Sequence, residues 1–151
     1  MYSKPPMPRV YFASDHAGFD LKNALVAHMK TLGYEVEDLG AHTLDQDDDY
    51  PDFVTPLAQR VAGEPGTFGI IIGGSGQGEA MAANRVIGVR GAEWYGGTTD
   101  VVRLAREHNN ANILSLGARF VSVEQASEAV HLFLKTPFSS EVRHARRLAK
   151  F

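Results

Sequence analysis

A glycine-rich loop that ends in a carboxylate is the stretch of this sequence with the clearest potential for chemistry. Residues 69–85 read GIIIGGSGQGEAMAANR, so three isoleucines run into the loop and Glu79 opens the helix that follows. Backbone N–H groups in such a loop, at the start of a helix, stabilise negative charge on a small ligand. A carboxylate beside them can move a proton. The pair suits proton abstraction next to a carbonyl group, where Glu79 takes the proton and the loop stabilises the enediolate.

Three known glycine motifs fit this loop only in part. Gly73 to Gly78 have the spacing of a P-loop, but Glu79 stands where the phosphate-binding lysine belongs. The dinucleotide fingerprint requires a third glycine at the position where this sequence has Glu79, although Glu93 would suit binding of a ribose. A serine-hydrolase elbow would need glycine in place of Gln77. A flavodoxin-like module that binds a nucleotide or phosphorylated ligand without chemistry stays open, as does a structural role in which Glu79 complements the helix dipole.

The elements that must position this loop follow from the hydrophobic pattern. Short apolar runs alternate with longer amphipathic stretches, which predicts an α/β fold with a doubly wound, five-stranded parallel sheet in the order 2-1-3-4-5. The predicted strands are Arg9–Ser14, Tyr34–Leu39, Phe68–Gly73, Gly88–Trp94 and Ala111–Gly117. The predicted helices cover 19–33, 52–61, 79–85, 98–107 and 123–135, with an extra C-terminal helix from Ser139 or Ser140. Residues 1–151 form a single domain in this interpretation.

The predicted strand order also places the site. A doubly wound sheet of this kind binds ligands at the carboxyl ends of its first and third strands, where the order reverses. The first strand delivers SDHAG, residues 14–18, and the third delivers the glycine loop. We therefore expect Asp15, His16, Ser75 and Glu79 to face one crevice.

Composition excludes several other classes of protein. The chain has 151 residues and a formal net charge of −3, which gives no electrostatic reason to expect nucleic acid or an anionic membrane as a partner. It contains 0 cysteines, so thiolate catalysis is excluded and a reducing cytoplasm is the expected location. No apolar run reaches membrane-spanning length.

Five blocks carry a resemblance to a known family. In chain order and over nearly the whole length they read SDHAGFDLK, DDDYPDF, GGSGQGEAMAANR, AREHNNANILSLGAR and RHARR. Together they resemble the type B ribose-5-phosphate isomerases, which belong with isomerases of allose and galactose 6-phosphates. Some members place a catalytic cysteine at the position of Gly73, and another branch uses a glutamate at the position of Glu79. The resemblance to this glutamate branch implies a cofactor-independent interconversion of ribose 5-phosphate and ribulose 5-phosphate through an enediolate.

The same resemblance implies a role for individual residues. Glu79 matches the base that moves the proton between C2 and C1, and Ser75 belongs to the anion hole with the loop N–H groups. His108 matches the proton donor that opens the sugar ring, a role for which Asp15 stays a second candidate. The implied substrate contacts are Asp15, His16, Gly74, Ser75, Gly76, Gln77, Gly78, Asn109, Arg119, Arg143 and Arg147, with the arginines as a phosphate clamp. Arg143 and Arg147 are four residues apart, so both can lie on one helix face and bind one phosphate.

Two features leave questions open within this family. The stretch between Arg90 and His108 is about two residues longer than the family pattern leads us to expect, which affects Trp94 to Thr99. Neither this region nor the motifs rank ribose 5-phosphate above tetrose or hexose phosphates. The acidic run from Asp45 to Asp49 contains no histidine ligand, so we interpret it as a solvated loop and predict that no metal is required.

The end of the chain predicts a homodimer or a dimer of dimers. The C-terminal helix has nothing left to cover in its own sheet. His108 should lie at the amino end of the fifth strand, away from its own crevice. A symmetric dimer would resolve both points by lending His108, Arg143 and Arg147 to the glycine loop of the partner.

Overall fold

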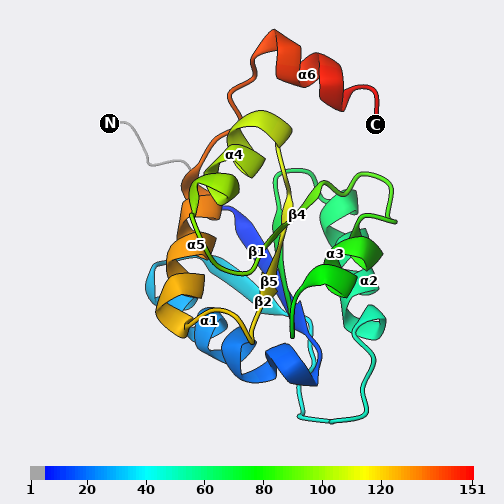
Figure 1. Cartoon of the computed structure of the whole chain (residues 1–151), viewed down its shortest axis with the longest axis vertical. Helices are drawn as coiled ribbons and strands as arrows, with labels where there is room; N and C mark the ends of the chain where they lie inside the picture. The colour runs from blue at the N-terminus through cyan, green and yellow to red at the C-terminus, as the bar shows by residue number, and fades with distance from the viewer. Residues whose placement is uncertain (1–5) are drawn as a thin grey trace.

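The structure is a computed structural model that describes residues 6–151, in which helices cover both faces of a parallel sheet (Figure 1). In chain order the elements are β1 (Arg9–Ser14), the 3₁₀ turn η1 (His16–Gly18), α1 (Phe19–Thr31), β2 (Glu35–Asp38), α2 (Pro51–Gly63), β3 (Phe68–Gly73), α3 (Gln77–Ala83), β4 (Gly91–Trp94), α4 (Asp100–Asn109), β5 (Ile113–Gly117), α5 (Val123–Lys135) and α6 (Val142–Leu148). None of the helices in this part of the chain combines the length and apolar character needed to cross a membrane.

Alternating side chains along each strand build two apolar layers. On β1, Val10 and Phe12 face the layer covered by α1, α4 and α5, while Tyr11 and Ala13 face the layer covered by α2 and α3. All four side chains are fully buried. This double covering explains why the central strands read as nearly continuous apolar runs.

The observed strand order is β2-β1-β3-β5-β4, so the predicted order is wrong for the last two strands. The fifth strand, ILSLG, is buried along its whole length, whereas GAEW of β4 is half-buried at all but its last residue. The more apolar strand therefore takes the central position and β4 forms the edge. Because parallel crossovers are right-handed, the step back from β4 to β5 carries α4 to the face that α1 covers.

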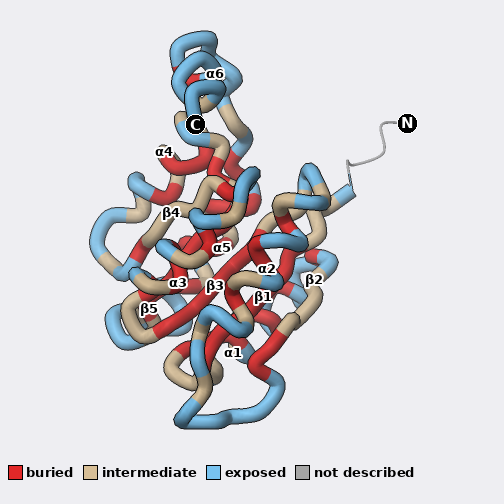
Figure 2. The backbone as a smooth tube through the Cα atoms, turned by 90° about the vertical axis from the view of Figure 1, so that its right-hand side faces the viewer, coloured by how far each residue is buried: buried red, intermediate tan, exposed pale blue. Residues whose placement is uncertain are grey.

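The extra C-terminal helix is confirmed, but it begins later than predicted. Ser140 has a left-handed backbone with φ of 59°, and Glu141 is extended, so the helix begins at Val142. The preceding segment is attached to α4, where Ser139 N donates to Glu107 O at 3.1 Å. Figures 1 and 2 show α6 beyond the end of α4, outside both helical layers, with most of its surface exposed.

Candidate active site

A cleft of about 430 Å³ lies at the carboxyl ends of β1 and β3, where the strand order reverses. Its walls come from the turn after β1, the N-cap of α2, the glycine loop after β3, the start of α3 and the loop after β5. The lining residues are Asp15, His16, Ala17, Tyr50, Gly74, Ser75, Gln77, Gly78, Glu79, Met81 and Arg119. The structure thus brings together the side chains that the sequence placed in one crevice.

The glycines of the loop allow a close approach that other residues would block. A Cβ atom at Gly73 would collide with the carboxylate of Glu79, so the base can fold back against the end of β3 only because this residue is glycine. Gly76 has a φ of 81°, a left-handed conformation at the N-cap of α3. The hydroxyl of Ser115 on β5 donates to Gly76 O at 2.7 Å and fixes the loop on the sheet. The loop is therefore held in place before any ligand binds.

Glu79 and Asp15 are both buried carboxylates of the cleft, with 4% and 6% of their surfaces exposed, and Glu79 is the more buried of the two. Burial raises the pKa of Glu79, a backbone hydrogen bond partly opposes this, and the nearby carboxylates of Asp15 and Glu93 raise the pKa further. A carboxylate with a raised pKa is a stronger base once it is deprotonated. This environment suits abstraction of a proton from carbon.

Asp15 and His16 shape the wall opposite the glycine loop. Asp15 Oδ1 accepts from Ala17 N at 3.0 Å and from Gly18 N at 3.3 Å, which caps the 3₁₀ turn. Gly18 itself packs so closely on Ile72 of β3 that a Cβ there would collide with the strand. The turn after β1 is therefore fixed directly beside the strand that carries the glycine loop.

Arg119 reaches the cleft because β5, not β4, lies next to β3. Ala118 N donates to Gly73 O at 2.8 Å, and Arg119 N donates to Gly74 O at 3.1 Å. The guanidinium lies over Gly74, where an added Cβ would be 3.0 Å from its Cζ. The corrected strand order thus accounts for a cation beside the glycine loop.

The remaining predicted site residues do not join this cleft within one chain. His108 lies in the last turn of α4 and its ring stacks on that of His144, with 4.2 Å between centroids. Arg143 pairs with Glu141 at 3.1 Å on α6, and Asn109 and Arg147 are exposed. This cluster lies at the opposite end of the sheet from the turn that begins α1 (Figure 1). Its distance from the cleft agrees with the position expected from the sequence.

Sequence reasoning missed Asp48 and Tyr50. The interpretation of residues 45–49 as a solvated loop is wrong for Asp48, whose side chain is only 7% exposed and binds His16. Its neighbours in the run are exposed, so the sequence held no signal to single out one of several similar acids. Tyr50 packs against the first turn of α3, where its hydroxyl group would collide with a side chain at Gly78. Its aromatic type inside an acidic run was the signal that could have drawn attention to it.

Asp15, His16 and Asp48 each place one potential ligand atom within 4.8 Å of the others. Three of the donor atoms in this group already have partners, however. Asp15 Oδ1 caps the 3₁₀ turn, and Asp48 Oδ1 lies 2.7 Å from His16 Nδ1. We assign no metal to this group, and the sequence-based expectation that none is required stays a prediction.

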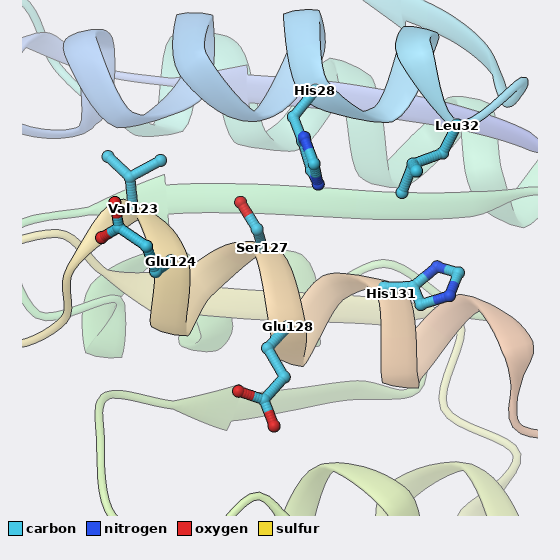
Figure 3. A pocket seen from close by; sticks show the side chains of 7 residues that line it. All are labelled: His28, Leu32, Val123, Glu124, Ser127, Glu128 and His131. Atoms are coloured by element: carbon cyan, nitrogen blue, oxygen red, sulfur yellow. The ribbon is translucent and has the colours of Figure 1, made fainter.

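A second groove, of about 530 Å³, lies between α1 and α5. Figure 3 shows His28 and Leu32 pointing from α1 toward α5, and Val123 and Ser127 pointing back from α5. Its walls are mostly apolar, and it contains neither a glycine loop nor an arginine. The switch-point cleft is therefore the better candidate for a small anionic ligand.

Fold and cleft together define a doubly wound α/β protein with a switch-point site for a small anion. The chain belongs to the Ribose/Galactose Isomerase family, whose model matches residues 10–151. This membership confirms the resemblance carried by the five sequence blocks.

Named relatives agree with the family assignment. The ribose-5-phosphate isomerase B of Mycobacterium leprae is 45% identical over 140 residues, covering 93% of this chain and 85% of the relative. That of Escherichia coli is 36% identical over 145 residues, covering 94% of this chain and 93% of the relative. A crystal structure of ribose-5-phosphate isomerase B from Mycoplasma genitalium with bound ribulose-5-phosphate superimposes with a TM-score of 0.90 at 40% identity, covering 96% of this chain and 94% of that one.

Proposed function

We propose that this chain interconverts ribose 5-phosphate and ribulose 5-phosphate by proton transfer through an enediolate. The observation that carries the proposal is the buried carboxylate of Glu79, held against Gly73 beside the backbone N–H groups of the glycine loop. The named relatives support the choice of substrate, since they are ribose-5-phosphate isomerases and one of them is solved with ribulose-5-phosphate bound.

The residues of the cleft supply each part of this reaction. Glu79 removes the proton from C2 of the open-chain aldose, and the C–H electrons form the C1–C2 double bond as the carbonyl electrons move onto O1. The N–H groups of the glycine loop and the Ser75 hydroxyl stabilise the charge on that oxygen. Glu79 then returns the proton to C1, while a proton passes from the C2 hydroxyl to O1 and leaves a ketone. Atoms and electrons balance without a cofactor.

The raised pKa of Glu79 predicts the acidic limb of the pH profile. Only the deprotonated carboxylate accepts a proton, so kcat/KM should fall as the pH drops through the pKa of Glu79. Because burial raises that pKa above its ordinary value of 4.5, the fall should come at a higher pH than for an exposed glutamate. A profile of kcat/KM against pH checks this. A rate that stays constant down to an ordinary carboxyl pKa would show that Glu79 is not the titrating base.

Chelation should leave the rate unchanged, because this proton transfer needs no Lewis acid. The check is a comparison of kcat/KM before and after exhaustive dialysis against a chelator. A large loss that an added divalent metal reverses would reopen Asp15, His16 and Asp48 as a metal site.

Ring opening and phosphate binding require residues from a second chain in this proposal. His108, Asn109, Arg143 and Arg147 lie far from their own cleft, and α6 projects beyond the fold, where a partner can meet it (Figure 2). A homodimer or a dimer of dimers would place them opposite Arg119 of the other chain. His108 or Asp15 would then pass the proton that opens the ring. A cytoplasmic location belongs to the same proposal.

A panel of sugar phosphates tests the function. Purified protein without additives should show its highest kcat/KM with ribose 5-phosphate when tetrose, pentose and hexose phosphates are compared. Preference for a hexose 6-phosphate would replace the substrate but keep the mechanism. Turnover of none of them, together with a nucleotide that raises the melting temperature, would favour a binding module instead.

A further inference from the structure

We propose that Asp48 is a positioning residue of this site, which fixes the ring of His16 and places a negative charge behind it, so that the ring faces the phosphate of the substrate. The inference rests on the proposed function for the identity of the substrate. It assigns a role to an acidic side chain that does not itself line the cleft.

The proposal rests on the geometry of Asp48 and His16. One oxygen of Asp48, Oδ1, accepts from the backbone N–H of His16 at 3.0 Å and lies 2.7 Å from its ring Nδ1. These two contacts hold the main chain and the ring together. With Nδ1 directed at the carboxylate, Nε2 is the ring nitrogen left to meet a ligand. The His16 side chain is 26% exposed and lines the cleft, whereas Asp48 is 7% exposed.

The hydrogen bonds of the Asp48 carboxylate indicate that it serves His16. Within residues 6–151 its side-chain hydrogen bonds go only to His16, and its second oxygen, Oδ2, is buried with no hydrogen-bond partner there. A buried carboxylate oxygen without a partner costs stability. Folding of the acidic loop alone gives no reason to bury the Asp48 carboxylate. The need for a fixed negative charge beside His16 does give such a reason.

Three charged groups act on the imidazole of His16. Asp48 and Asp15 favour its cationic form, while burial and Arg119 oppose it. The hydrogen bond that the His16 ring donates to Asp48 is the largest of these influences, and the pKa of His16 is raised. His16 and Arg119 are the two side chains lining the cleft that can carry positive charge. Together they suit the dianionic phosphate of the substrate.

Replacing Asp48 by asparagine removes the negative charge of the side chain and keeps its shape, so the two contributions can be measured separately. Asparagine can still accept both hydrogen bonds through Oδ1, but it removes the negative charge. We expect KM for ribose 5-phosphate to rise by about tenfold at neutral pH, the ratio that corresponds to weakening one charge-assisted contact, with a smaller change in kcat. The increase of KM at alkaline pH should also begin at a lower pH, since His16 loses its proton sooner. Asp49→Asn is the matched control, because Asp49 is adjacent and exposed, and it should behave as wild type.

A second readout does not depend on the substrate. The pKa of His16 can be measured by NMR titration of its ring protons, assigned with a His16→Gln variant. It should fall in Asp48→Asn and stay unchanged in Asp49→Asn, whether or not the protein turns over ribose 5-phosphate. An unchanged His16 pKa would overturn the proposal. So would a KM equal to that of the Asp49 control, or a parallel loss of kcat and melting temperature, which would mark Asp48 as structural. If instead the wild type fails to isomerise the sugar while the His16 pKa still falls in Asp48→Asn, the proposed function fails and the role of Asp48 stands.

Discussion

Replacing Glu79 with glutamine should lower kcat by ~100-fold or more while KM changes little, because a general base contributes rate enhancements of this size. Glutamine has nearly the same shape and can fill the space against Gly73, but it cannot accept the proton from C2. The loss should therefore appear in turnover and not in binding. Steady-state kinetics with ribose 5-phosphate measure it directly.

Glu93→Gln is the matched control for this variant. Glu93 is a half-buried acid near Glu79, with its Oε1 buried, but it does not line the cleft. Its removal should keep most of the turnover and move the acidic limb of the pH profile to lower pH, because its charge raises the pKa of Glu79. Near-normal turnover in Glu79→Gln would show that another group is the base.

Mixing two inactive variants should restore activity. Glu79→Gln damages the cleft of its own chain, and Arg147→Ala damages the residue that we expect to be lent to the partner. In a mixed dimer, one site would then carry both changes and the other would be intact. Random pairing makes half of the dimers mixed, and half of the sites in those are intact, so about a quarter of the wild-type activity should return. The measurement is the isomerase rate after subunit exchange, with exchange confirmed by mass spectrometry.

The control for this experiment is a mixture of each variant with itself, treated in the same way. If exchange is complete and activity stays at the level of the separate variants, Arg147 serves its own chain. The positions of His108 and α6, both remote from the cleft of the same chain, would then need another explanation.

The hydrophobic pattern of the sequence predicted most of the fold. The bounds of Arg9–Ser14 and Phe68–Gly73 match β1 and β3, because both are apolar runs that end at clear turn signals. Which neighbour each strand pairs with is a matter of packing, and alternation along the chain does not record it. The higher apolar content of ILSLG favours the central position for β5 and leaves GAEW at the edge as β4. That contrast in apolar content was visible in the sequence and could have corrected the prediction.

The cleft was predictable for a different reason. Residues that follow β1 and β3 must meet wherever the winding of the sheet reverses, so Asp15 and Glu79 could be placed together without knowledge of side-chain packing. Arg119 was assigned by resemblance, and its place depends on β5 lying next to β3. Asp48 was beyond reach, because only the folded loop distinguishes a buried acid from its exposed neighbours.

The approach to equilibrium from both sides is the sharpest test of the proposed interconversion of ribose 5-phosphate and ribulose 5-phosphate. Purified protein, without metal or cofactor, is incubated separately with ribose 5-phosphate and with ribulose 5-phosphate, and the sugars are followed by NMR. We expect both samples to converge on the same ratio of the two phosphates. Sugar phosphates that remain unchanged over the same period, in protein shown to be folded and dimeric, would contradict it.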